Sequence, residues 1–485
     1  MSSVSPGARR SRLLWVSILY FAEGLPYGLF SDVIPVQWRE QGVSLARIGA
    51  LSLLGLAWTL KFLWAPAIDH VRRHRRWMAV ADIAMALIAL FFAWHTSFDS
   101  TAWIAVGAFT ILSATNDIAI DGYTIDLLPK DEMGIANGLR IGFYRVGLLA
   151  AGFVLTMSSF IGWRGAYFVA AGLLVVDAIA CLNAPTEPPV PAVPAPAIGN
   201  ELGMLVRNPA AIGLVALLAL AALKLGADGL HLRFPALAGW GLFAVAAFGL
   251  TIGRLRPGRA KLADLRQGPM FGALMEMLSR PDMPAVLLFI LTYKLAETAL
   301  GFMVKPFWVD AGFSAAEIGL VSVNIGIALS IAGGLFGGWA TDRLGLFRAL
   351  WLLGLVQALP NLVYWAAASW FMPHAAGAPI SVAERVVVYL ASGTESFASG
   401  VGTSAFLAFL MAIVNKRRSA AEFALLSSVF AFSRSLAGFA SGIGAATLGY
   451  AHYFLITFLL GFPAYLFLPW VRRMLDQADR FEAAD

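Results

Sequence analysis

Two acidic residues stand four positions apart inside an apolar stretch of this sequence. Asp117 and Asp121 lie in residues 101–128, where the only other charged side chain is Asp126. Residues four apart share one face of a helix, so the charge of one carboxylate and the loss of hydration both favour a proton on the other. A carboxyl group that gains and loses a proton can couple a membrane process to a proton gradient. These acids are therefore candidate proton carriers.

Further charged residues interrupt apolar stretches along the whole chain. Each costs about 2.5 to 3.5 kcal/mol at the centre of a membrane-spanning helix, so each needs a partner, water or a task. The other candidate proton carriers are Glu23, Asp32, Asp126, Glu297 and Glu395. The candidate substrate-binding side chains are Lys61, Arg140, Arg145, Lys294 and Arg434, together with the aromatic residues Tyr27, Trp58 and Tyr123. The alternative for every one of them is a structural role.

That structural alternative can be stated for each group of residues. Asp117 or Asp121 could pair with Arg140 or Arg145, and Glu297 could pair with Lys294 or Lys305. The aromatic side chains could stack on a sugar face, but such residues more often pack in a core or lie at the membrane interface. The sequence leaves both interpretations open.

The composition identifies the elements that position these residues. Of 485 residues, 59% are hydrophobic and only 13% are charged, and the mean hydropathy is +0.75. These values are typical of a multi-pass membrane protein and exclude a soluble enzyme or a single-pass receptor. The single cysteine, Cys181, excludes a disulfide framework and a four-cysteine zinc site. No His-Glu-x-x-His, Gly-x-Ser-x-Gly or Gly-x-x-x-x-Gly-Lys motif occurs, so we expect no enzyme activity, no metal, no cofactor and no ATP hydrolysis.

Apolar runs predict an all-α membrane protein with about fourteen spans. The predicted spans are 13–38, 43–68, 77–95, 101–128, 134–160 and 163–184, then 284–309, 314–341, 348–371, 383–414, 420–446 and 450–472, with an extra pair within 209–252. The predicted divisions are an N-terminal half (1–184), a proline-rich linker (185–208), an extra hairpin (209–252), a basic segment (253–283), a C-terminal half (284–475) and a tail (476–485). Two six-helix halves with a two-helix insert are thus expected.

The distribution of basic residues predicts the orientation. With the N-terminus inside, 23 of the 35 Lys and Arg residues fall on the inner side and five in the outer loops. The positive-inside rule then places both termini in the cytoplasm, and it explains the net charge of +6 without nucleic-acid binding. We expect a monomer in a lipid bilayer whose partners are a small molecule and protons.

An internal repeat relates the two halves. An offset of 270 residues aligns the segment 38–52 with 308–322 and pairs seven identical residues, among them Trp38 with Trp308 and Gly42 with Gly312. Six-helix halves in the same orientation, with the substrate held between them, are similar to the construction of major facilitator transporters. After a three-residue adjustment, the repeat also sets Asp69, in a basic loop, opposite Asp342, and we expect the two loops to form a cytoplasmic gate, unless such loops only fix the topology. The predicted gate residues are Asp69, Arg73, Asp342 and Arg343.

Three segments resemble the AmpG muropeptide permeases. Leu60-Lys-Phe-Leu-Trp-Ala-Pro-Ala-Ile-Asp69 is similar to the end of their second helix, Asn116-Asp-Ile-Ala-Ile-Asp-Gly-Tyr-Thr-Ile-Asp-Leu-Leu128 to their fourth, and Tyr144-Arg-Val-Gly-Leu-Leu-Ala-Ala-Gly152 to their fifth. The resemblance extends over both halves. It implies fourteen helices and proton-driven import of GlcNAc-1,6-anhydroMurNAc peptides across the bacterial inner membrane for peptidoglycan recycling. It also marks Lys61, Asp117, Asp121, Asp126, Arg145 and Glu395 as functional candidates.

The fourth-helix segment also leaves a second substrate open. This chain has Asn116 where the family commonly has Gln, and Gly122-Tyr123 where it commonly has Ala-Trp. Acetyl-coenzyme A transporters share the two aspartates followed by glycine and an aromatic residue. The alternative function is therefore transport of acetyl-coenzyme A or of an amphiphilic, drug-like anion.

Overall fold

Helices make up all the secondary structure in the part of the protein that the structure describes. The computed structural model describes residues 6–61, 64, 68, 73–95, 97–128, 133–186, 243–245, 247, 277, 280–371, 380–414 and 419–482. Within these residues, nine helical runs are long and apolar enough to cross a membrane. The prediction of an all-α membrane protein is confirmed, while the predicted hairpin 209–252 lies almost wholly outside the described residues.

The N-terminal half is built from long helices joined by short turns. Its elements are α1 (Pro6–Gly28), η1 (Leu29–Val33), α2 (Ile34–Glu40), α3 (Leu45–Leu54), α4 (Leu56–Leu60), α6 (His74–Trp94), α7 (Ser100–Leu127) and α8 (Met133–Asn183). The elements α1, η1 and α2 form one continuous run, in which η1 is a π-helical turn. The element α8 turns sharply at Gly162, where φ is 71°, so it comprises two helices.

The C-terminal half has the same general construction. Its elements are α14 (Met283–Tyr293), α15 (Leu295–Asp310), α16 (Ala315–Glu317), η4 (Ile318–Ile325), α17 (Gly326–Leu344), α18 (Leu346–Phe371), α19 (Val382–Ala412), α20 (Ser419–Leu459), η6 (Pro463–Phe467) and α21 (Leu468–Glu482). A second kink, at Gly449 with φ 72°, divides α20. Both kinks fall between spans that the hydropathy pattern separates.

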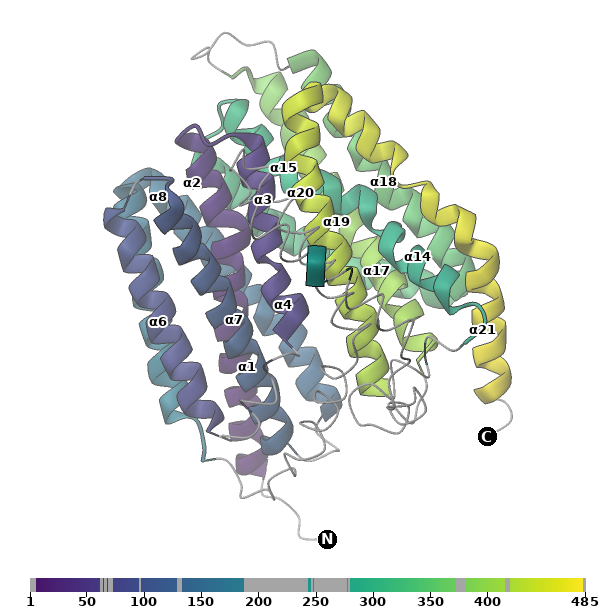
Figure 1. Ribbon diagram of the computed structural model, residues 1–485, viewed down its shortest axis with the longest axis horizontal. Coiled ribbons are helices and arrows are strands. Elements are labelled where there is room, and N and C mark those ends of the chain that lie inside the picture. Colours follow the sequence, from purple (N-terminus) through teal and green to yellow (C-terminus); the bar gives the residue numbers. More distant parts are fainter. Residues whose placement is uncertain are drawn as a thin grey trace.

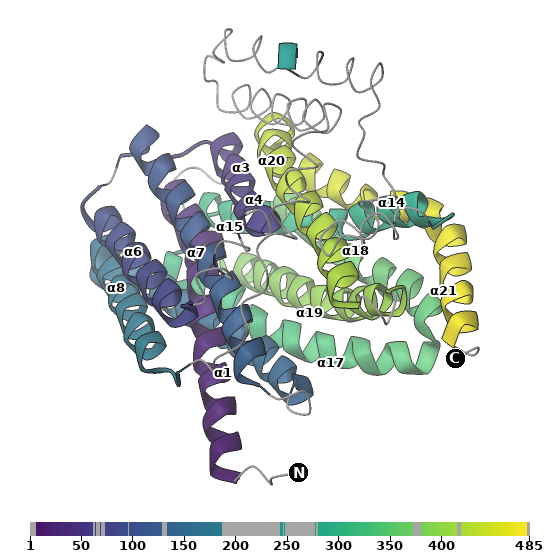
Figure 2. The same ribbon diagram turned by 60° about the horizontal axis from the view of Figure 1, so that its bottom comes forward.

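The two halves lie side by side (Figures 1 and 2). The N and C ends of the chain lie toward one end of the bundle, and the turn between α2 and α3 lies at the opposite end (Figure 1). We name these the terminal end and the distal end. The strongest packing between the halves joins α3 to α20 and α8 to η4.

The internal repeat produces the same turn twice at the distal end. The amide of Val43 donates to the Trp38 carbonyl at 2.9 Å, and the amide of Phe313 donates to the Trp308 carbonyl at 3.0 Å. Each turn contains a glycine with a positive φ, 85° at Gly42 and 88° at Gly312. A residue with a β-carbon is strained in that backbone conformation, which explains the repeated glycine. The structural equivalence predicted for these segments is confirmed here.

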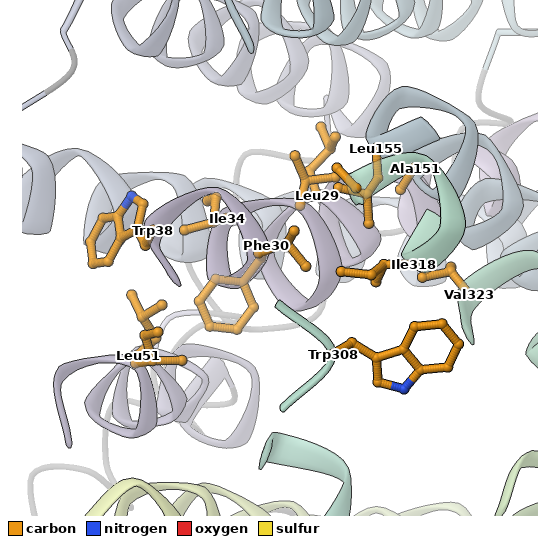
Figure 3. Packing of buried hydrophobic residues seen from close by; sticks show 14 of the residues in the cluster. Leu29, Phe30, Ile34, Trp38, Leu51, Ala151, Leu155, Trp308, Ile318 and Val323 are labelled. Carbon is orange, nitrogen blue, oxygen red and sulfur yellow. The ribbon is translucent and has the colours of Figure 1, made fainter. Parts of the chain in front are cut away.

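A hydrophobic core joins the halves toward the distal end. In Figure 3, Ala151 and Leu155 of α8 lie against Ile318 and Val323 of η4. The same buried cluster continues through Trp38, which is 1% exposed, and through many residues of α6, α7, α15 and α20. Toward the terminal end, by contrast, the described residues form two separate cores, one confined to each half. The apolar core therefore connects the halves at the distal end only.

Glycines permit this close packing. A β-carbon on Gly49 of α3 would lie 2.7 Å from the Cα atom of Gly442 on α20, which is shorter than van der Waals contact. The Ser52 hydroxyl donates to the Ser435 carbonyl at 2.7 Å, and the Ala316 amide donates to the Ser159 hydroxyl at 2.8 Å. Helices in lipid associate through such small residues and interhelical hydrogen bonds. These contacts hold the halves together in the conformation seen here.

Candidate functional site

Three elements of the N-terminal half bring charged side chains together. Lys61 follows α4, and its Nζ atom lies 2.9 Å from Oδ2 of Asp117 and 3.7 Å from Oδ2 of Asp121 on α7. Arg140 of α8 places Nη1 at 3.1 Å from Oδ1 of Asp121. The Tyr20 hydroxyl of α1 donates to the same Asp121 oxygen at 3.1 Å. Together with Glu23, we name these residues the Lys61 cluster.

Glu23 is the least satisfied member of the Lys61 cluster. Its side chain is 6% exposed, and its Oε1 atom lies 4.0 Å from Nη2 of Arg140. Its Oε2 atom is buried without a hydrogen-bond donor among the described residues. The carboxyl group of Asp117 acts on Glu23 electrostatically. The cluster thus contains three carboxyl groups and two bases, which is a net charge of −1 when all are ionised.

A salt bridge joins the two halves inside the bundle. Lys305 of α15 places Nζ at 2.5 Å from Oδ1 of Asp32, and the side chains are 21% and 10% exposed. Asp32 belongs to the π-helical turn η1, and such turns occur frequently at functional sites. Asp32 is therefore paired in this conformation.

The C-terminal half holds a second polar group around Lys294. Lys294 pairs with Glu297, its Nζ donates to the Thr403 hydroxyl at 2.6 Å, and Gln357 Oε1 lies at 3.4 Å. The Ser399 hydroxyl donates to Glu297 Oε1 at 2.8 Å. The ammonium group is only 4% exposed and already has three partners. This saturation indicates a structural role for Lys294.

Glu395 has fewer polar partners than Lys294. It lies on α19, and the Ser396 hydroxyl donates to its Oε2 atom at 3.3 Å. No described basic side chain comes within ion-pairing distance of its carboxylate. Glu395 therefore lacks a direct cationic partner among the described residues, whereas Glu23 lies 4.0 Å from Nη2 of Arg140.

Aromatic side chains gather around Arg434 of α20. Its Cζ atom lies 5.5 Å from the ring centre of Tyr27 and 5.9 Å from that of Phe302. Tyr27 contacts Trp58 edge to face at 5.2 Å and Tyr144 at 6.1 Å. These rings come from α1, α4, α8 and α15, so both halves contribute to the group.

At the distal end, a second salt bridge joins the halves. Arg39 binds Asp310 with two hydrogen bonds, Nε to Oδ1 at 2.6 Å and Nη2 to Oδ2 at 2.5 Å. The Tyr450 hydroxyl donates to the same carboxylate at 2.7 Å, and Nη1 of Arg39 donates to the Val43 carbonyl at 2.9 Å. We name Arg39, Asp310 and Tyr450 the distal lock. The sequence does not predict this lock. Arg39 and Asp310 are 271 positions apart, and the repeat offset of 270 sets Glu40, the neighbour of Arg39, opposite Asp310.

The structure places three predicted site residues away from these groups. Tyr123 is fully buried in the core of the N-terminal half and its hydroxyl donates to the Pro185 carbonyl at 2.8 Å, which does not fit contact with a substrate. Arg145 and Asp126 are half-buried, and neither has an ion pair within the described residues. The pairing left open in the sequence is resolved as Asp121 with Arg140, while Asp117 pairs with Lys61 instead.

Three of the four predicted gate residues lie within the described part of the chain. Asp342 and Arg343 end α17 with exposed side chains, and Arg343 lies over the Trp339 ring at 5.4 Å. Arg73 is exposed at the start of α6, and Asp69 lies outside the described residues. No ion pair among the described gate residues links the halves. The two separate cores at the terminal end likewise show no shared apolar cluster among the described residues.

Sequence reasoning also missed a buried polar group inside the N-terminal half. Asp82 of α6 is fully buried, and Asn116 Nδ2 donates to its Oδ1 atom at 2.8 Å. The Cys181 thiol donates to Oδ2 at 3.6 Å, and Asp177 lies nearby. A single acid in an otherwise apolar run gives no signal until its neighbours on other helices are known.

Comparison with known families identifies the fold. The profile of the Major Facilitator Superfamily matches residues 16–277, more than half of the chain. The chain belongs to the major facilitator superfamily. The predicted superfamily fold is therefore confirmed, and this superfamily protein is a multi-pass membrane transporter.

Individual relatives agree with this assignment. The chain is 27% identical to the anhydromuropeptide permease of Escherichia coli K12, over 95% of this chain and 79% of that protein. It is 22% identical to putative transporter AmpG 4 of Rickettsia conorii, over 96% and 97% of the two chains. Among solved structures, a bacterial homologue of the human lysosomal transporter Spinster superposes with a TM-score of 0.65 at 14% identity, covering 98% and 99% of the chains. The resemblance to the AmpG permeases is confirmed.

Proposed function

We propose that this superfamily member is a proton-coupled importer of anhydromuropeptides, GlcNAc-1,6-anhydroMurNAc with or without peptide. It lies in the inner membrane of a bacterium as a monomer, with both termini in the cytoplasm, and returns cell-wall fragments for recycling. The proton gradient supplies the energy, without a cofactor. The similarity to the Escherichia coli permease over 95% of the chain supports the substrate.

The observation that carries the proton coupling is the charge imbalance of the Lys61 cluster. Among the described residues, the only basic side chains that Glu23, Asp117 and Asp121 face at contact distance are Lys61 and Arg140, so one added proton makes the cluster neutral. An unneutralised charge in a membrane span is costly, which favours binding of that proton. Glu23 is the best acceptor, because Asp121 is already paired with Arg140 and Lys61 and accepts a hydrogen bond from the Tyr20 hydroxyl.

The conformation supports the direction of transport. The distal lock and the shared apolar core close the distal end, while among the described residues no ion pair of the predicted gate links the halves at the terminal end. With the basic residues on the cytoplasmic side, the distal end faces the periplasm. This conformation then releases substrate and proton into the cytoplasm, and opening of the distal lock admits the next pair.

The proposal is tested with purified protein in proteoliposomes and radiolabelled GlcNAc-1,6-anhydroMurNAc. Uptake is measured with and without an acidic exterior for the wild type, for Glu23→Gln and for Glu40→Gln. The Glu40 variant is a matched control on the same helical run, since Glu40 only accepts a hydrogen bond from Trp163 Nε1 at 2.9 Å and glutamine can still accept it. One coupled proton supports about tenfold accumulation per pH unit of the gradient.

We expect the wild type and Glu40→Gln to accumulate the disaccharide only under the gradient. Glu23→Gln should lose accumulation but retain exchange of labelled for unlabelled substrate, because glutamine resembles the protonated acid. Normal accumulation by Glu23→Gln would move the proton site to Glu395, Asp121 or Asp126. Absence of uptake by folded wild-type protein would reject the muropeptide and direct the same assay to acetyl-coenzyme A.

A further inference from the structure

Some basic side chains inside the membrane spans form a salt bridge with a carboxylate, and others do not. Lys61 binds Asp117, Arg140 binds Asp121, Lys294 binds Glu297 and Lys305 binds Asp32. Within the described residues, no carboxylate lies at ion-pairing distance from Arg145 or Arg434. Among the basic side chains that the structure describes inside the spans, these two can bind an anion without first breaking a salt bridge.

Arg434 differs from Arg145 in its surroundings. Its side chain is exposed although it projects among membrane-spanning helices, and its guanidinium group lies over Tyr27 of one half and Phe302 of the other. Arg145 has no aromatic ring or acid in contact among the residues described. Arg434 is therefore the unpaired cation that both halves surround.

The aromatic rings hold the guanidinium group without using its hydrogen bonds. A cation over an aromatic face is attracted by the ring electrons and keeps its N–H donors available. Two acids, Asp32 and Glu297, act on Arg434 electrostatically but remain paired with their lysines. The planar guanidinium group, with its N–H donors beside aromatic rings, fits an anionic oxygen group that is attached to an apolar or sugar part of a ligand.

We propose that Arg434 binds the carboxylate of the transported substrate, with Tyr27, Trp58 and Phe302 contacting the body beside it. This inference rests on the proposed function and names the chemical group that the same site recognises. On the disaccharide, the group is the lactyl carboxylate of the muramic acid residue. On acetyl-coenzyme A, a phosphate would take the same place.

The test compares the disaccharide acid with its primary carboxamide, which has the same size but no negative charge. Uptake by exchange is measured for the wild type, Arg434→Gln, Arg434→Lys and Arg164→Gln. Arg164 is the matched control, because its guanidinium also lies over two rings, Trp94 at 5.3 Å and Phe168 at 6.0 Å, on the outer face of one half. Surface expression and thermal stability show whether each variant is folded.

We expect the wild type and Arg164→Gln to take up the acid about 10- to 100-fold more efficiently than the amide, the range for hydrogen bonds to a charged group. Arg434→Gln should lose this discrimination by losing uptake of the acid alone. Arg434→Lys should keep part of it, since lysine retains the charge but not the two-pronged geometry. Equal loss of acid and amide in folded Arg434→Gln, or unchanged discrimination, would overturn the proposal.

A second measurement separates this proposal from the muropeptide assignment. Phenylglyoxal modifies accessible guanidinium groups, and mass spectrometry reports the extent at each arginine. We expect free N-acetylmuramate, but not its amide, to slow modification of Arg434 and to leave Arg164 unaffected. Protection without uptake of the disaccharide would keep the anion site and reject the muropeptide. No protection, despite uptake, would reject the anion site alone.

Discussion

The distal lock should set the balance between the two conformations of the transporter. Asp310→Asn removes the negative charge and one of the two oxygens that accept hydrogen bonds from Arg39, and it leaves a weaker acceptor for Tyr450. The Arg39 and Asp310 side chains are 20% and 21% exposed, so the pair falls between a surface salt bridge and a buried one. We expect its loss to cost about 1 to 3 kcal/mol, which lowers the ratio of distal-closed to distal-open molecules about 5- to 150-fold.

Spin labels on the two halves measure that ratio. Cysteines at Ile161 and Val382 carry the labels, since these side chains are 47% and 78% exposed near the distal end. The only native cysteine, Cys181, is buried and should remain unlabelled. We expect a narrow distance distribution in the wild type and a longer component in Asp310→Asn.

Two further variants make the interpretation specific. Arg385→Gln is the control, because the pair of Arg385 with Glu317 lies near the same end but within one half, so the distances should not change. Exchange of the charges, in Arg39→Asp with Asp310→Arg, should restore part of the short distance. An unaltered distribution in folded Asp310→Asn would refute the reasoning that this pair holds the halves together.

Two other predictions follow from the packing and the helix caps. Gly49→Val should separate α3 from α20 and abolish uptake, since its β-carbon would lie 2.7 Å from Gly442. Gly107→Ala is the control and should transport normally, because its β-carbon would meet only Leu54, at 3.8 Å. Equal uptake by the two variants would show that the glycine contact is dispensable. The pKa of Asp99 is lowered by hydrogen bonds from the amides of Ala102 and Thr101 and from the side chain of His95. Its helix cap therefore stabilises the protein fully above the usual pKa of aspartate, about 3.9, and this stabilisation is lost as the pH falls through the lowered pKa. Asp99→Ala should therefore reduce the melting temperature at neutral pH by more than in acid, and a pH-independent difference between variant and wild type would contradict this.

The sequence predicts those parts of the fold that depend on local pattern. Hydropathy separates the helices at Gly162 and Gly449, where the backbone does turn sharply. The repeated Trp-x-x-x-Gly segments predict two equivalent turns, because the positive φ at Gly42 and Gly312 is a local requirement of the backbone.

Pairing between distant helices is harder to predict. Lys61 and Asp117 are 56 positions apart, and the Arg39–Asp310 pair spans 271 positions, so several partners of similar chemistry are open for each charge. The choice among them depends on how each helix is rotated and on its depth in the bundle. Tyr123 shows the same limit, because hydropathy does not tell which face of α7 turns into the core of its own half.

The central claim is that the transporter moves a proton together with an anhydromuropeptide, and proton entry tests it most directly. A pH-sensitive dye inside proteoliposomes reports the luminal pH when GlcNAc-1,6-anhydroMurNAc is added outside. We predict acidification of the lumen by the wild type that depends on the disaccharide and is absent in Glu23→Gln. Entry of the labelled disaccharide into wild-type vesicles without any change of luminal pH would contradict the claim.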